Sequence, residues 1–196
     1  MTGKNACSRI RRAQNGGELW NHLRRSHSFF NFFLGAAQQK PPRAVPESLR
    51  VPAGQELLLH AQATGFQIYV CQAGQDQKAG WGLKAPEATL LDSKGKEIGK
   101  HYAGPTWKHK DGSEVTGKVA ARQDSPDSNS IPWLLLNANG HTGDGIFSRV
   151  TAIQRLHTKG GQPPAAAGCD ESKLGTEVKT PYSADYYFYA PAAHTP

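Results

Sequence analysis

Histidine is the residue type in this sequence with the widest range of possible chemistry. The chain has 196 residues, of which eight are histidines. Imidazoles that project from neighbouring strands are common ligands of zinc and copper. Five of them form a candidate set of metal ligands: His60, His101, His109, His141 and His157. Their spacing follows no metal-binding motif, and the alternative is that they are surface or core histidines held by hydrogen bonds.

The segment from His101 to Ser113 holds the densest group of side chains suited to recognition. It contains imidazoles, a phenol, an indole and an acid within thirteen positions. Aromatic faces bind sugars and other flat ligands. The candidate ligand-binding residues are therefore His101, Tyr102, Trp107, His109 and Asp111. The alternative is that the aromatic rings of this segment belong to the core.

Motifs of the common enzyme classes are absent from the sequence. It has no phosphate-binding loop, no dinucleotide fingerprint, no HExxH or CxxC pair and no serine in a nucleophile elbow. These absences favour a binding module over an enzyme, and whether the protein is an enzyme stays open. We expect no cofactor, with zinc or copper as the alternative if the histidines form a site.

The positive charge of the chain is confined to its N-terminal part. Residues 1–44 contain eight basic residues and one acidic residue, whereas residues 45–196 contain fifteen of each. Proteins that bind nucleic acid need a basic face toward the phosphates. We therefore expect no nucleic-acid partner for the neutral part of the chain.

The N-terminal region resembles an export signal. A basic stretch at residues 23–25 precedes an apolar run at 29–34 and small residues at 35–37, which is the order of a secretory signal peptide. We expect residues 1–44 to be a basic leader followed by a proline-rich linker, and the protein to be secreted or periplasmic. A disordered basic N-terminus is the alternative. No apolar run approaches the roughly 20 residues that cross a bilayer.

The cysteines fit the same expectation. Cys7 lies in the leader, which leaves Cys71 and Cys169 in the mature chain. An even number of cysteines in an exported protein indicates a disulfide. Two separate buried thiols are the alternative, and they would suit a cytosolic protein.

Short alternating segments separated by turns predict the elements that must position these residues. Ser93–Lys96 and Lys110–Ser113 are hairpin turns, and Thr64–Gly65 is a plausible tight connection. The main predicted strands cover residues 56–63, 66–72, 81–85, 88–92, 97–102, 106–109, 114–121, 131–138, 146–158 and 185–190. About nine or ten short strands predict an all-β, single-domain antiparallel β-sandwich or barrel with long loops. The domain covers residues 45–191, and residues 192–196 form a frayed tail.

Four stretches of the chain resemble a bacterial and fungal family that carries domain of unknown function 3455. They are residues 45–72, 85–118, 131–170 and 182–191, and they include LLLHAQATGFQIYVCQ, AGPTWKHKDGS and SADYYFYAP. The resemblance implies that Cys71 and Cys169 belong to the family pattern and that the β domain is extracytoplasmic. It implies no activity.

The residues and the resemblance together predict an exported, non-enzymatic binding or surface-associated β module. Its ligand would be a polysaccharide or another component of the cell envelope. The alternative function is a small metal-dependent enzyme, similar to an oxidoreductase, that uses a histidine cluster.

Overall fold

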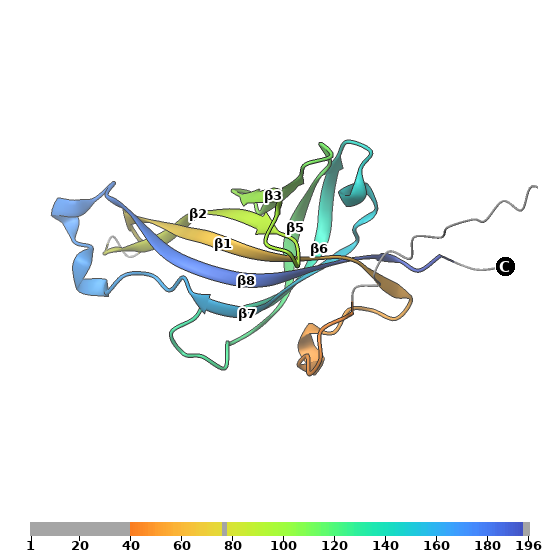
Figure 1. The fold of residues 1–196 in the computed structure, drawn as a ribbon. Coiled ribbons are helices and arrows are strands. Elements are labelled where there is room, and N and C mark those ends of the chain that lie inside the picture. Colours follow the sequence, from red (N-terminus) through yellow and green to blue (C-terminus); the bar gives the residue numbers. More distant parts are fainter. Residues whose placement is uncertain (1–39, 76–77, 194–196) are drawn as a thin grey trace, which may run out of the picture. The chain divides into compact units, whose positions relative to one another are not determined.

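Within the residues that the structure describes, the chain folds as an eight-stranded antiparallel barrel. The computed structural model describes residues 40–75 and 78–193, so the predicted leader lies almost wholly outside the described residues. Each strand pairs with the next along the chain, and the last pairs back with the first (Figure 1). The strands are β1 (Gln55–Ala73), β2 (Ala79–Leu91), β3 (Glu97–Tyr102), β4 (Thr106–His109), β5 (Glu114–Gln123), β6 (Trp133–Thr142), β7 (Ala152–Gly160) and β8 (Glu177–Pro191). The predicted all-β antiparallel class is confirmed.

Several predicted strands merge into longer ones. The tight connection predicted at Thr64–Gly65 is wrong, because β1 runs without a break through this pair. Gly65 lies opposite Ala88 of β2 on one side and Tyr182 of β8 on the other. A Cβ atom at this position would overlap the carbonyl oxygen of Glu87. The glycine is therefore needed for the close approach of β2, and not for a turn.

Other strand boundaries also differ from the prediction. The two strands predicted at 81–85 and 88–92 are one strand, β2, and the last strand begins at Glu177 and not at Asp185. Residues 146–158 are not one strand: a 3-10 helix, η2 (Ile146–Arg149), precedes β7. The N–H of Ile146 donates to the Asp111 carboxylate at 2.7 Å, which holds η2 against the β4–β5 turn. The hairpin turns at 93–96 and 110–113 are confirmed, with Gly95 and Gly112 at positive φ.

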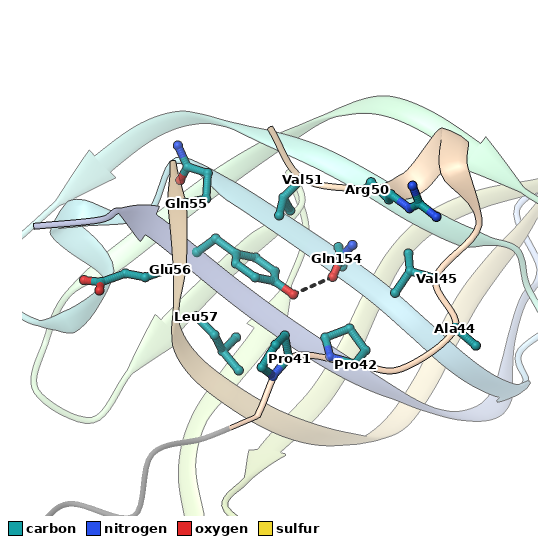
Figure 2. A pocket seen from close by; sticks show the side chains of 11 residues that line it. Pro41, Pro42, Ala44, Val45, Arg50, Val51, Gln55, Glu56, Leu57 and Gln154 are labelled. Carbon is teal, nitrogen blue, oxygen red and sulfur yellow. Dashed lines mark hydrogen bonds between the residues drawn. The ribbon is translucent and has the colours of Figure 1, made fainter. Parts of the chain in front are cut away.

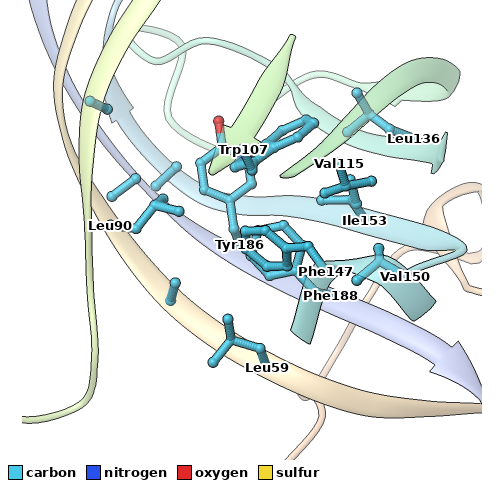
Figure 3. Close-up of a cluster of buried hydrophobic side chains, with 14 of the residues drawn as sticks. Leu59, Leu90, Trp107, Val115, Leu136, Phe147, Val150, Ile153, Tyr186 and Phe188 are labelled. Atoms are coloured by element: carbon cyan, nitrogen blue, oxygen red, sulfur yellow. The ribbon is translucent and has the colours of Figure 1, made fainter. Parts of the chain in front are cut away.

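The core packs inward-facing side chains into one part of the barrel. Phe147 of η2 and Phe188 of β8 lie at its centre, with ring centroids 4.6 Å apart (Figure 3). The ring of Trp107 in β4 packs edge-on against the ring of Phe188, with the centroids 6.1 Å apart. Small residues of β1 and β8, including Ala61 and Ala184, face the same interior. Alternation of large and small side chains lets the rings pack inside a narrow barrel.

A segment before β1 covers an apolar stripe on the outside of the barrel. Leu49, in the 3-10 helix η1 (Glu47–Leu49), is fully buried against outward-facing residues that include Leu135, Leu156 and Tyr187. The Nε2 of Gln154 donates to the Leu49 carbonyl at 2.6 Å. The Tyr189 hydroxyl donates to Gln154 Oε1 at 2.7 Å, which is the dashed line in Figure 2. We call residues 40–54 the strap. Its contacts explain why apolar side chains are tolerated on both faces of β6, β7 and β8.

A disulfide joins Cys71 at the end of β1 to Cys169 in the loop between β7 and β8, with the Cα atoms 5.4 Å apart. The predicted pairing is confirmed, and the alternative of two free thiols is wrong. Cys71 shares the inward face of β1 with Tyr69 and Gln67. No helix within residues 40–75 and 78–193 is long and apolar enough to cross a membrane.

Removal of the disulfide should lower stability substantially. The bond closes a loop of 98 residues, and loss of such a cross-link costs roughly 2–5 kcal/mol because the unfolded chain gains freedom. We expect the double variant Cys71→Ser/Cys169→Ser to unfold at a correspondingly lower denaturant concentration. The reduced wild type is the comparison and should unfold at the same lowered midpoint as the double variant. An unchanged midpoint in the double variant would contradict this account.

A side chain at Gly65 should disrupt the packing between β1 and β2. We expect Gly65→Ala to lower the free energy of unfolding by about 1–3 kcal/mol, the usual cost of overpacking. Gly80 of β2 is the matched control, because a Cβ there meets no atom within 4 Å. Gly80→Ala should change stability by about 0.5 kcal/mol or less. If urea unfolding shows that both substitutions change the free energy of unfolding equally, the close approach of β2 is not the reason why residue 65 is a glycine.

Candidate functional site

The barrel wall is incomplete beside the short hairpin of β3 and β4. β2 pairs with β3 only from Ala88 to Leu91, and β4 pairs with β5 only from Thr106 to Lys108. Among the described residues, no strand therefore pairs with residues 79–87 of β2 or 118–123 of β5 on the sides that face each other. A slot opens between these two stretches because the hairpin is too short to bridge them.

A cavity of about 630 Å³ lies behind this slot. Its rim carries Leu83 of β2 and Val119 of β5, which are 57% and 51% exposed. Aliphatic side chains continue the wall inward, among them Ile131, Leu134 and Leu136. The polar lining is concentrated deeper, in Gln67, Tyr69, His101, Trp107, Arg155 and Tyr186. An apolar cavity with a few convergent polar groups is the usual form of a small-molecule site.

Two of the predicted ligand-binding residues form one aromatic wall of this cavity. The His101 ring stacks on Trp107 with centroids 4.4 Å apart and planes within 6° of parallel. The ring of Tyr186 packs edge-on against the ring of Trp107, with the centroids 5.4 Å apart (Figure 3). Trp107 is 1% exposed, so it belongs to the core and is not a stacking platform on the surface. His101 is also buried, and both rings line the cavity.

His101 is held as a neutral imidazole. Its Nδ1 lies 2.8 Å from the Thr106 carbonyl oxygen, which can only accept, so Nδ1 carries the proton. Burial lowers the pKa of His101 to about 3, although the bond to Thr106 opposes that change. The Arg155 charge lowers the pKa further. The remaining ring nitrogen is therefore an acceptor near neutral pH.

Buried donors in the cavity lack protein partners. Gln67 Nε2 and Trp107 Nε1 are both buried, and neither makes a hydrogen bond to the described part of the chain. An unpaired buried polar group costs roughly 1–3 kcal/mol. Tyr69, in contrast, is satisfied because its hydroxyl donates to the Gly161 carbonyl at 2.7 Å. The two unpaired donors are the kind of group that a ligand would satisfy.

The other three predicted ligand-binding residues lie away from the cavity. Tyr102 is adjacent to His101, so strand alternation turns it to the outer face, where it donates to Glu114 at 3.0 Å. Asp111 accepts hydrogen bonds from Ser113 and Ile146 and holds the β4–β5 turn to η2. Burial opposes ionisation of Asp111, but these hydrogen bonds outweigh it and lower its pKa. His109 Nδ1 lies 3.1 Å from the same carboxylate.

The five histidines proposed as metal ligands do not gather at one point. His60 Nε2 and His157 Nδ1 both contact the Asp185 carboxylate, at 3.2 and 2.8 Å, on the outer face of the barrel. His157 has a positive φ of 50°, at a bulge in β7. His141 Nε2 contacts the Val150 carbonyl at 2.7 Å, and His101 lies in the cavity. Within the part of the chain that the structure describes, no three or more His, Cys, Asp or Glu side chains form a group suited to a metal ion.

A second hollow lies under the strap on the outside of the barrel. It measures about 550 Å³ and is lined by residues of the strap together with Gln55, Glu56, Leu57, Gln154 and Tyr189 (Figure 2). Its deeper polar groups are already bonded: Gln154 to Leu49 and Tyr189, and Gln55 to the Thr151 hydroxyl. The hollow therefore offers a ligand fewer free groups than the cavity inside the barrel.

Sequence reasoning missed several residues of the cavity, namely Gln67, Tyr69, Leu83, Val119, Arg155 and Tyr186. One signal was present for Arg155. It shares a strand face with Ile153, which is fully buried, and an arginine on a buried face is unusual. The alternation of β1 likewise placed Gln67 and Tyr69 on one face with Cys71. Nothing in the sequence indicated that β2 and β5 border a gap.

The buried His101 should make stability depend on pH. Its pKa is about 3 in the folded protein and near 6.5 in the unfolded chain. The unfolded state therefore takes up a proton first as the pH falls. Stability should decrease by about 2 kcal/mol between pH 7 and pH 5, where most carboxylates stay ionised. We expect His101→Gln to be less stable at pH 7 and to lose this dependence in urea titrations.

Tyr102→Phe is the control for His101→Gln, because it alters the exposed neighbour and should keep the wild-type slope. The same slope of stability against pH in His101→Gln and the wild type would show that another group is responsible.

Comparison with known proteins places the chain in a family. No curated protein matches the sequence significantly, and no solved structure does either. The family model described as "Protein of unknown function (DUF3455)" matches residues 52–190. This span begins just before β1 and ends one residue before the end of β8, so it covers the whole barrel. The chain belongs to this family of proteins of unknown function.

Proposed function

We propose that the protein is a non-enzymatic binding module that holds a small, largely apolar molecule inside its barrel. The cavity behind the slot carries this proposal. Its rim exposes Leu83 and Val119 to solvent, whereas its interior places two unpaired donors, Gln67 Nε2 and Trp107 Nε1, beside aromatic rings. Eight-stranded barrels of this size hold either packed side chains or one small ligand. The free donors favour the second use.

The lining of the cavity supports binding more than catalysis. Among the described residues it contains no serine, threonine, cysteine, aspartate or glutamate. A nucleophile paired with a base, or two carboxylates, would be needed for the common hydrolytic mechanisms. His101 is the imidazole in the lining, and its Nδ1 is committed to Thr106. No observation in the described residues favours the alternative of a zinc or copper enzyme.

The disulfide supports an extracytoplasmic location for this activity. Bonds such as Cys71–Cys169 persist in oxidising compartments and are rare in the cytosol. A ligand from the cell envelope would suit that location. The cavity favours a small envelope molecule over a polysaccharide chain, since Trp107 is buried and offers no open face for sugar rings in a row.

Binding of a neutral apolar probe tests the proposal. We expect N-phenyl-1-naphthylamine to bind with one-to-one stoichiometry and to become fluorescent. Val119→Trp, which places an indole at the mouth of the cavity, should weaken that binding by about tenfold or more. Fluorescence titration of both proteins gives the dissociation constants.

Lys118→Trp is the matched control, because Lys118 precedes Val119 on β5, is exposed and does not line the cavity. It should bind the probe as the wild type does. Absence of saturable binding, or equal affinity in Val119→Trp and the wild type, would overturn the proposal.

A further inference from the structure

The charged side chains of the cavity are all basic. Lys84, Arg122 and Arg155 line it, and no carboxylate does so among the residues that the structure describes. Two of the three have acidic partners outside the lining. The Lys84 ammonium pairs with the Glu177 carboxylate, and a guanidinium nitrogen of Arg122 lies 3.8 Å from a carboxylate oxygen of Asp124. Arg155 alone makes no ion pair within the described part of the chain.

Arg155 projects into the barrel from β7. Its Nε and one terminal nitrogen donate to the Pro132 carbonyl, at 3.2 and 2.9 Å, which fixes the guanidinium group against the cavity wall. A guanidinium has five N–H donors, so this carbonyl leaves part of the group for other acceptors. The side chain is half-buried, and its charge acts on the surrounding residues Tyr69, His101 and Tyr186.

Among the described residues that line the cavity, no acidic group balances this charge. Burial raises the pKa values of Tyr69 and Tyr186 above that of a free phenol, so both side chains are neutral near pH 7. Three buried polar atoms of the lining lack a hydrogen bond to the described part of the chain: Gln67 Nε2 and Trp107 Nε1, which can only donate, and the Tyr186 hydroxyl, which can donate or accept. The interior of the cavity thus offers an excess of donors and one uncompensated positive charge. A ligand that complements it must supply acceptors and a negative charge.

We infer that the natural ligand is an amphipathic anion, whose carboxylate or similar acidic group binds Arg155 while its apolar body lies in the slot between Leu83 and Val119. This inference rests on the proposed function, because it names the ligand class of the same cavity. The two rim residues give the apolar body a surface at the mouth, and the acceptor-rich end reaches the donors inside. Pairing with Arg155 gives the ligand one orientation, with its acid group inward.

Two probes that differ only by an acid group test the inference. 1-Anilinonaphthalene-8-sulfonate carries a sulfonate on the ring system of N-phenyl-1-naphthylamine. We expect the wild type to bind the sulfonate at least about tenfold more tightly. In Arg155→Met the two dissociation constants should become equal through loss of affinity for the sulfonate, and Arg155→Lys should keep part of the preference. Lys118→Met, which removes an outward cation from β5, should keep the full preference.

Each outcome separates the inference from the proposed function. If the neutral probe binds as tightly as the sulfonate in the wild type, the inference is wrong and the proposed function stands. If the neutral probe shows no saturable binding, the proposed function fails, whatever the sulfonate does. If Arg122→Met abolishes the preference and Arg155→Met does not, the rim supplies the charge and the assignment to Arg155 is wrong. The wild-type ratio decides the ligand class even if Arg155→Met does not fold, and circular dichroism identifies that case.

Discussion

The pairing of the first strand with the last is the interaction on which the rest of the structure depends. β1 and β8 are the longest strands, and they pair from Gln55 opposite Pro191 to Val70 opposite Glu177. Because they lie at opposite ends of the domain, their pairing requires closure of a long loop, which is entropically costly. The closed sheet in return removes the free strand edges that β1 and β8 would otherwise expose. Two features stabilise the pairing of β1 with β8. The strap lies at the Gln55 end of β1, and the disulfide lies at the Cys71 end.

The same closed sheet creates the cavity. Six strands complete the wall around the packed core, and the short hairpin of β3 and β4 leaves part of it open. Unpaired donors and a half-buried cation inside a barrel lower stability, so the well-packed end around Phe147 and Phe188 must offset them. Natural proteins commonly trade stability for a binding site in this way. The division of the barrel into a packed part and an open part is therefore the structural basis of the function we propose.

Much of the fold could be predicted from the residues themselves. Alternation of apolar and polar residues indicated antiparallel strands, and the glycines at 95 and 112 indicated hairpin turns, because both are local properties of the chain. The number of strands was less predictable. Gly65 is a residue type that is common in turns, yet it lies in the middle of β1. A glycine is needed there because β2 approaches too closely for a side chain. A residue that serves a contact with a distant strand cannot be distinguished from a turn residue by local pattern alone.

Part of the candidate site could be predicted from the sequence, and the rest depends on the tertiary structure. The sequence by itself determined the all-β class, the absence of common catalytic motifs and the pair of cysteines, since residue type and local order are enough for each. It also marked His101 and Trp107, although it grouped them with Tyr102, His109 and Asp111, which face elsewhere. Only the tertiary structure decided that Gln67, Arg155 and Tyr186 meet at one cavity. Gln67 comes from β1, whereas Arg155 and Tyr186 come from β7 and β8 at the other end of the domain. Their proximity follows from strand register and barrel closure, which no local pattern encodes.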